Sequence, residues 1–118
     1  MSDEARLHRG DVWLVDFGSD PRDPEQAFRQ PAVVVSEDRL HHPNLQMVIV
    51  VPGTSRILGI PLHVVVSPDR GNGLAAETAF QAEQVRAVST DRLVDRVGRV
   101  DAPTLLAIDE VLRKTLSL

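Results

Sequence analysis

The sequence of 118 residues contains no cysteine. This absence excludes disulfide bonds, thiolate metal sites and cysteine nucleophiles together, and it fits a reducing compartment such as the cytoplasm. The chain also lacks any apolar run near the ~20 residues that a membrane-spanning helix requires. Its acidic first residues show no apolar core of a secretory signal. These absences favour a cytoplasmic protein without a membrane segment.

Lysine is almost absent as well. Lys114 is the one lysine among 13 basic residues, the other twelve being arginine, and the formal net charge is -4. The negative balance argues against a protein that coats nucleic-acid duplexes by general charge attraction. Arginine is the residue of bidentate phosphate and base contacts, but a GC-rich genome would produce the same bias. Composition alone leaves both explanations of the arginines open.

Motifs that bind metals or phosphates are missing too. His41 and His42 are adjacent, and adjacent residues on a strand point to opposite faces. His8 lies in the N-terminal tail, and His63 stands between apolar neighbours. No zinc, calcium, Gly-x-Gly-x-x-Gly or Walker pattern is present, so we expect no metal and no cofactor. Catalysis by a Ser-His-Asp set stays open, although no nucleophile elbow supports it.

The chain does contain short apolar, β-branched runs between prolines, glycines and polar residues, a pattern typical of β-strands. The predicted strands are 11–17, 31–36, 46–51, 60–66, 77–82 and 93–100, while 85–88 is a strand or a single turn. We expect Pro52 to stop the third strand, and Gly98 indicates a bulge in the last. Residues 18–30 are predicted to form a long loop, and such loops in compact domains are usually functional or mobile.

One helix is predicted, at the end of the chain. Asp101 is a suitable N-cap, and Pro103 is tolerated in the first turn. An apolar stripe at helical spacing follows, made by Leu105, Ile108, Leu112 and Leu116. We expect a single domain over residues 1–118, with a loose tail at 1–8. Short strands followed by one helix predict a mainly β (α+β) fold, a small antiparallel barrel or curled sheet with the helix packed on it.

Polar side chains flank two of the predicted strands. Arg29-Gln30 comes directly before the strand 31–36, and Thr54-Ser55-Arg56 follows the strand 46–51. If these strands pair antiparallel as neighbours, the two groups converge at one rim of the sheet. Guanidinium, hydroxyl and amide groups at one place suit a phosphodiester, because they bind its oxygens and stabilise developing charge without a metal. Polar residues at strand ends are also what any loop contains, so this pattern alone is a weak indication of function.

Several segments in order resemble one known family. They are Arg9 to Phe17 (RGDVWLVDF), residues 25–36 (EQAFRQPAVVVS), residues 50–55 (VVPGTS) followed by 59–61, residues 84–89 (QVRAVS) and the strand 93–100. No single motif is strong, but together they cover residues 9–116 in a specific order and spacing. As a set they resemble the MazF/PemK-type toxins of bacterial toxin–antitoxin systems.

The resemblance implies both a fold and a chemistry. Such toxins are small, curled antiparallel SH3-like β-barrels of five to seven strands with a C-terminal α-helix, and they form homodimers. Most cut single-stranded RNA at short sequences without a metal, through attack by the RNA's own 2′-hydroxyl. The products carry a 2′,3′-cyclic phosphate and a 5′-hydroxyl. The implied partners are single-stranded RNA and a MazE-like antitoxin whose acidic, disordered segment folds on binding.

The resemblance also assigns catalytic residues, with one departure. The family's catalytic threonine falls on Thr54. Its catalytic arginine directly precedes the proline of the second strand, where this chain has Gln30, with Arg29 one residue earlier. Glutamine can hydrogen-bond a phosphate but carries no charge. We favour Arg29, which can reach round from the loop end, over the alternatives that Arg56 takes the role or that activity is weak.

Further residues are expected to contact RNA. The full set of expected RNA contacts is Phe17, Glu25, Gln30, Ser36, Ser55, Arg56, Gln84 and Arg86. Phe17 could stack a base. Glu25 is equally explained as an exposed loop acid, and Gln84 as the cap of a turn.

Two rival functions remain open. Related small barrels are toxins that inhibit DNA gyrase by binding it, without catalysis. The second rival is a catalytically impaired homologue that only binds RNA, which the glutamine at position 30 keeps open.

Overall fold

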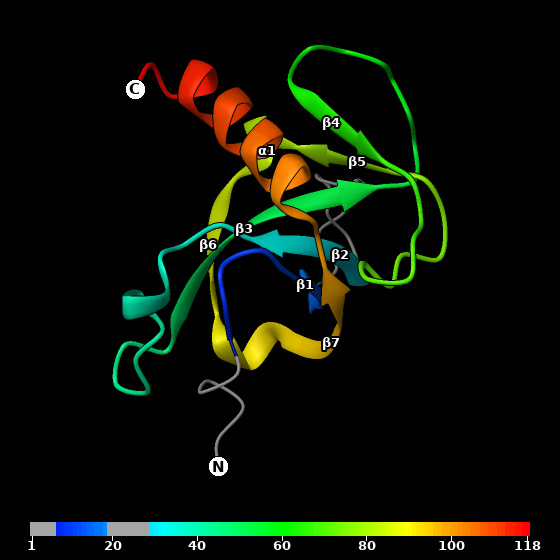
Figure 1. The fold of residues 1–118 in the computed structure, drawn as a ribbon. Coiled ribbons are helices and arrows are strands. Elements are labelled where there is room, and N and C mark those ends of the chain that lie inside the picture. Colours follow the sequence, from blue (N-terminus) through cyan, green and yellow to red (C-terminus); the bar gives the residue numbers. More distant parts are fainter. Residues whose placement is uncertain (1–6, 19–28) are drawn as a thin grey trace.

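The computed structural model describes residues 7–18 and 29–118. In these residues, strands and short 3-10 turns are followed by one C-terminal α-helix (Figure 1). The strands are β1 (Asp11–Asp16), β2 (Arg29–Val34), β3 (Met47–Thr54), β4 (His63–Val66), β5 (Thr78–Gln81), β6 (Arg86–Ser89) and β7 (Leu93–Arg99). The turns are η3 (Asp38–Leu40), η4 (Ala82–Gln84) and η5 (Thr90–Arg92), and the helix is α1 (Ala102–Thr115). Each predicted strand is present, and the ambiguous segment 85–88 is largely the strand β6.

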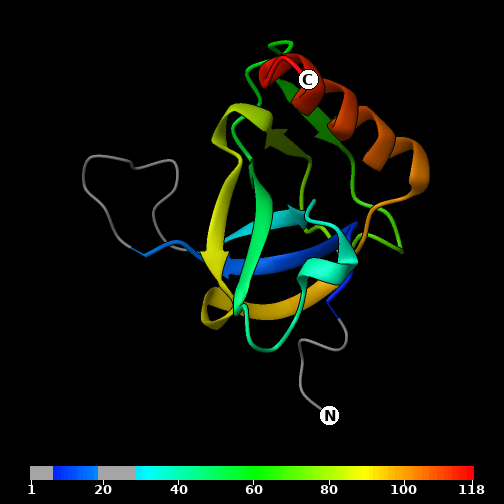
Figure 2. The same cartoon turned by 90° about the vertical axis from the view of Figure 1, so that its left-hand side faces the viewer.

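All strand pairs are antiparallel, and β3 lies at the centre of the sheet. The strand order is β4-β5-β3-β2-β1-β7, and β6 pairs with the first half of β3. Figure 2 shows the strong curl of this sheet: β3 and β6 run across β1, β2 and β7, and α1 lies over one end. Among the described strands, no ladder joins β6 to β7. The mainly β fold with a terminal helix is therefore confirmed, but the predicted barrel is a curled sheet left open between these two strands.

The third strand does not stop at Pro52, contrary to the prediction. β3 continues to Thr54 because it changes partner at this point: Pro52 lies opposite Ala32 of β2, whereas Gly53 pairs with Phe80 of β5. Proline has no N–H to offer a ladder, so it fits where one partner strand ends and the next begins. A Cβ on Gly53 would lie 2.5 Å from a methyl carbon of Thr78, so glycine allows the second partner to approach.

The alternation of side chains along the strands divides the core into two clusters, one on each face of the sheet. The first contains Leu7, Trp13, Val15, Ala32, Val34, Val48, Val50 and Val88. The second contains Val12, Val33, Val51, Val66, Leu74, Phe80, Val100 and Ile108, and it lies under α1. Successive residues of β1, β2 and β3 thus pack into different clusters, which determines the face to which every other residue of these strands points.

The C-terminal helix begins and packs as predicted. The Asp101 carboxylate accepts a hydrogen bond from the backbone N–H of Thr104 at 2.8 Å, and hydrogen bonding from Thr104 lowers the pKa of Asp101. Ile108 is buried in the second cluster, and Leu105 and Leu112 pack against it. Leu116 is exposed, so the stripe contacts the sheet over three of its four predicted positions. In the described part of the chain, no helix is both long and apolar enough to cross a membrane.

The predicted bulge in the last strand is present. The register of β7 against β1 shifts next to Gly98, which pairs with Val12. A Cβ on Gly98 would lie 2.4 Å from the backbone carbonyl carbon of Asn72 and 2.4 Å from the carbonyl oxygen of Gly71. The loop before β5 therefore packs directly against β7, and a side chain at this position would push two backbones apart.

We expect Gly98→Ala to lower the free energy of unfolding by about 3 kcal/mol, because neither backbone can give way without strain. Gly59→Ala is the matched control. Gly59 has a φ of +67°, but a Cβ there meets nothing within 4 Å, so its cost is about 1 kcal/mol of backbone strain. Urea unfolding at unchanged m-value measures both. Equal losses in the two variants would contradict the proposed packing of this loop against β7.

Candidate active site

The predicted convergence at one rim of the sheet rests on antiparallel pairing of β2 and β3, and this pairing is present. Ala32 lies opposite Pro52, and Val33 lies opposite Val51. Continuing this register by two residues places Gln30 beside Thr54. The start of β2 and the end of β3 therefore bring a side-chain amide and a hydroxyl to the same edge.

The register also shows which face each side chain takes. Gln30 lies opposite Val15, whereas Arg29 lies opposite Asp16. Directly opposed residues share a face, and successive residues alternate. Gln30 therefore points to the face of Val15, which is also the face of Thr54, while Arg29 starts on the other face. The alternation along β2 thus favours Gln30 over Arg29 for the face of Thr54.

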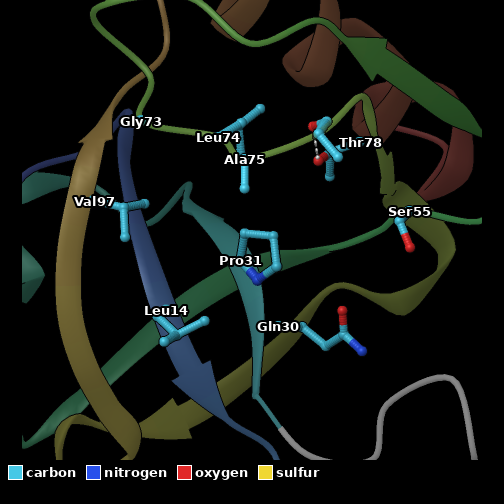
Figure 3. A pocket seen from close by; sticks show the side chains of 10 residues that line it. Leu14, Gln30, Pro31, Ser55, Gly73, Leu74, Ala75, Thr78 and Val97 are labelled. Carbon is cyan, nitrogen blue, oxygen red and sulfur yellow. Dashed lines mark hydrogen bonds between the residues drawn. The ribbon is translucent and has the colours of Figure 1, made fainter.

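A cavity of about 280 Å³ lies at this rim (Figure 3). Gln30 and Ser55 form one polar side of it, and Figure 3 shows the hydroxyl of Thr78 bonded within its own segment. The apolar wall is formed by Leu14, Pro31, Leu74 and Val97. An apolar pocket with a few polar groups at its edge is typical of a ligand site.

Thr54 is almost buried, with 9% of its surface exposed. Its Oγ1 accepts a hydrogen bond from the backbone N–H of Arg56 at 3.1 Å, which holds the turn after β3. A threonine hydroxyl can accept two hydrogen bonds and donate one. The hydroxyl is therefore oriented by the backbone and still able to donate to a bound phosphate.

Phe17 and Arg86 lie together in a second cavity of about 300 Å³. The Arg86 guanidinium lies 5.3 Å from the centre of the Phe17 ring, a cation–π contact. Arg92 borders the same cavity and donates to the carbonyl oxygen of Asp16 at 3.3 Å. Stacking leaves the in-plane N–H groups of Arg86 free to point outward, so this cavity offers a base-stacking surface next to positive charge.

Gln84 is half-buried in η4, and its neighbour Glu83 makes a side-chain hydrogen bond with a buried histidine that the sequence did not predict. The Nε2 of His63 lies 2.8 Å from Oε2 of Glu83. The His63 side chain is only 1% exposed, whereas that of Glu83 is 29% exposed. The apolar neighbours of His63 in the sequence indicated that it is buried. Its partner Glu83 follows β5, so this contact could not be predicted without knowing that β4 pairs with β5.

Ser36, another residue expected to contact RNA, lies at some distance from the rim of Arg29 and Gln30 along β2. It follows the opposite end of β2 from Arg29, and it is buried. Its Oγ lies 2.6 Å from Nε2 of His41 and accepts the backbone N–H of Ile49 at 3.1 Å. A hydroxyl engaged in this way helps to hold the connection between β2 and β3 together.

The remaining predicted residues lie around the rim or outside the structure. Ser55 and Arg56 follow Thr54 and are exposed. Glu25 lies outside the described residues. Within residues 7–18 and 29–118, no three histidine, aspartate or glutamate side chains are grouped closely enough to hold a metal ion.

Comparison with known proteins identifies the family of this chain. Residues 8–116 match the family model described as PemK-like, MazF-like toxin of type II toxin–antitoxin system. Endoribonuclease MazF9 of Mycobacterium tuberculosis is 39% identical, in an alignment that covers 95% of this chain and 98% of that relative.

Solved structures show the same fold. MazF from Deinococcus radiodurans matches with a TM-score of 0.76 at 22% identity, over 95% of this chain and 97% of that one. A MazE-MazF structure from the same organism matches with a TM-score of 0.76 at 20% identity, over the same shares of the two chains. The match over nearly all of its residues shows that this chain belongs to the PemK-like and MazF-like toxins of type II toxin–antitoxin systems.

Proposed function

We propose that the protein is a metal-independent endoribonuclease toxin that cleaves single-stranded RNA at specific short sequences. The observation that carries the proposal is the antiparallel pairing of β2 and β3, which brings Gln30 and Ser55, the residue after Thr54, to one cavity in a chain of this toxin family. The relative from M. tuberculosis is named an endoribonuclease. Cleavage of messenger RNA would inhibit translation and stop growth.

In the proposed reaction, the RNA supplies its own nucleophile. The 2′-oxygen bonds to phosphorus while the bond from phosphorus to the 5′-oxygen breaks, which leaves a 2′,3′-cyclic phosphate and a 5′-hydroxyl. The protein binds the scissile phosphate and stabilises its developing negative charge. The Thr54 hydroxyl and the Gln30 amide supply hydrogen bonds on one face of the sheet.

Arg29 is the proposed catalytic cation. It is the first residue of β2 and is exposed. An arginine side chain is long, and Arg29 stands at the very start of the strand. Its guanidinium can therefore extend around the end of β2 to the face of Thr54. Arg56, which follows Thr54 by two residues, is the alternative source of charge.

The proposed partners are single-stranded RNA, a MazE-like antitoxin and a second copy of the chain, and the proposed location is the cytoplasm. A structural neighbour contains MazE together with MazF, which supports an antitoxin partner. Phe17 and Arg86 are proposed to hold RNA next to the cleavage site, because ring and guanidinium lie at the surface of one cavity. Ser55, Gln84 and Glu25 are proposed as further RNA contacts.

Purified protein is expected to cut a long single-stranded RNA in the presence of EDTA, because no step requires a metal. The fragments should carry 5′-hydroxyl ends, which polynucleotide kinase labels without prior phosphatase treatment. A primer-extension map would then give the cleavage sequence. Uncut RNA, together with binding to DNA gyrase, would instead support the gyrase-inhibitor function.

Thr54→Ala is expected to lower kcat about 100-fold, since it removes one donor to the phosphate in the transition state. Thr54→Ser keeps the hydroxyl and is the matched control. Its rate should stay within about tenfold of the unmutated protein, the difference reflecting loss of one packed methyl group. Expression of Thr54→Ala should also relieve growth arrest. Equal activity of Thr54→Ala and the unmutated protein would remove Thr54 from the mechanism.

Separate substitutions of Arg29 and Gln30 decide which residue serves the phosphate. If Arg29 is the catalytic cation, Arg29→Ala lowers kcat about 100-fold and Gln30→Ala lowers it less. Gln30→Arg places a charge on the face of Thr54 and should restore activity to the Arg29→Ala variant. Full activity of Arg29→Ala, with loss of activity in Gln30→Ala, would show that the Arg29 assignment is wrong.

A further inference from the structure

We propose that Asn72 is a modification site: its side-chain amide is lost spontaneously when the loop around it opens, and the product inactivates the protein. The chain contains two asparagines, Asn44 and Asn72, and only Asn72 is followed by a glycine. A glycine has no side chain to hinder its backbone nitrogen as this atom approaches the amide carbon of the preceding residue. An Asn-Gly pair is therefore the dipeptide in which this attack is least obstructed.

Asn72 is buried, with 1% of its surface exposed, and both polar atoms of its side chain are bonded. Its Oδ1 accepts the backbone N–H of Asp69 at 3.1 Å and that of Leu74 at 3.0 Å. Its Nδ2 donates to the carbonyl oxygen of Ser67 at 2.9 Å. Aspartate would lack the donor, and glutamine would be too long by one carbon. The loop between β4 and β5 therefore requires an asparagine at this position.

The next residue has to be glycine for a different reason. Gly73 has a φ of +67°, and a Cβ there would lie 1.9 Å from the carbonyl oxygen of Val97 in β7. A larger residue would be strained in its backbone and would also push the loop away from β7. Two independent requirements of the fold thus place the most reactive dipeptide in the wall of the candidate site.

The folded loop restrains the reaction. To turn its carbon toward the nitrogen of Gly73, the amide must leave the three hydrogen bonds made by Oδ1 and Nδ2 of Asn72. The backbone on both sides is held against β7, since the carbonyl oxygen of Gly71 also accepts the N–H of Arg99 at 2.8 Å. Local opening of this loop removes the restraints together, so the modification is coupled to opening.

The chemistry needs only water. The backbone nitrogen of Gly73 loses its proton to solvent and bonds to Cγ of Asn72, while the bond from Cγ to Nδ2 breaks and ammonia leaves. The resulting five-membered cyclic imide is then opened by one water molecule. Attack at one carbonyl carbon gives aspartate, and attack at the other gives isoaspartate, in which the main chain runs through Cγ.

Neither product fits the loop. Aspartate would direct a buried carboxylate oxygen at the carbonyl oxygen of Ser67, in place of the Nδ2 donor. Isoaspartate would add one carbon to the main chain between Gly71 and Gly73, which both lie against β7. Gly73 and Leu74 line the cavity beside Gln30 (Figure 3). The modification would therefore displace the wall of the candidate active site, so this inference rests on the proposed function for its effect on activity.

The chemical part of the proposal is tested by mass spectrometry. The protein is held at neutral pH in buffer or in guanidinium chloride, both prepared in water enriched in heavy oxygen, and is then cut with trypsin. Cleavage after Arg70 and Arg86 releases residues 71–86, in which Asn72 is the one asparagine. Heavy oxygen should enter this peptide about 100-fold faster in the denaturant, because three hydrogen bonds no longer have to open first.

The second asparagine is an internal control in the same samples. Asn44 is exposed and is followed by Leu45, whose side chain hinders attack by its backbone nitrogen. The tryptic peptide 40–56, which contains Asn44, should therefore remain an amide in both conditions over the same period.

The functional part is tested by refolding. After the denaturant is diluted, the recovered rate of RNA cleavage should equal the fraction of chains that still have an amide at Asn72, because the converted chains cannot rebuild the loop. The matched control is Asn72→Ser, which keeps a hydroxyl acceptor and has no amide to lose. This variant should return to its own starting rate after the same incubation. Converted protein, separated by ion exchange, should also unfold at a lower urea concentration than unconverted protein.

Equal rates of conversion in buffer and in denaturant would overturn the inference, as would converted chains that unfold at the same urea concentration as the unconverted ones. Loss of activity by Asn72→Ser to the extent seen in the unmutated protein would overturn it as well. If the unmutated protein does not cut RNA, the proposed function fails, while the mass and unfolding measurements still decide the fate of Asn72.

Discussion

The change of partner within β3 is the constraint on which the rest of the molecule depends. Up to Pro52 this strand pairs with β2 and β6, and from Gly53 it pairs with β5. One continuous strand thereby joins the two parts of the sheet and forces the curl seen in Figure 2. Thr54 lies directly beyond this change of partner, where the ladder to β2 has ended. Its hydroxyl accepts the backbone N–H of Arg56 and is therefore held by the turn after β3.

Charge in this molecule is organised locally. The net charge of -4 gives no general attraction for a polyanion. Arg86 nevertheless stacks on Phe17 at the surface of one cavity, and Arg29 begins the strand beside another. Other arginines are neutralised, as where Arg96 and Arg99 both contact buried Asp11 at 3.3 Å. A site that binds a few phosphates needs only a few locally placed arginines, such as Arg86 and Arg29.

Much of the fold could be predicted because its signals are local. The β-branched runs identified the strands, and Asp101 with its apolar stripe identified the helix, since propensity and periodicity act over a few residues. The prediction that Pro52 ends the third strand was wrong. Proline usually ends a strand, and the exception here depends on a second partner strand far along the chain. The surroundings of Ser36 could not be predicted for a similar reason, since its hydroxyl contacts His41 and a backbone group of the neighbouring strand.

The sequence by itself determined which chemical groups are available: hydroxyls, amides, carboxylates and arginines at strand ends, with no thiol among them. Only the tertiary structure decided which of them share a face. Gln30 rather than Arg29 points to the side of Thr54, and buried His63 meets Glu83 across two strands and a turn. The physical reason is the pleat: neighbours in sequence point apart, and residues that point together are chosen by a register set between strands distant in the chain.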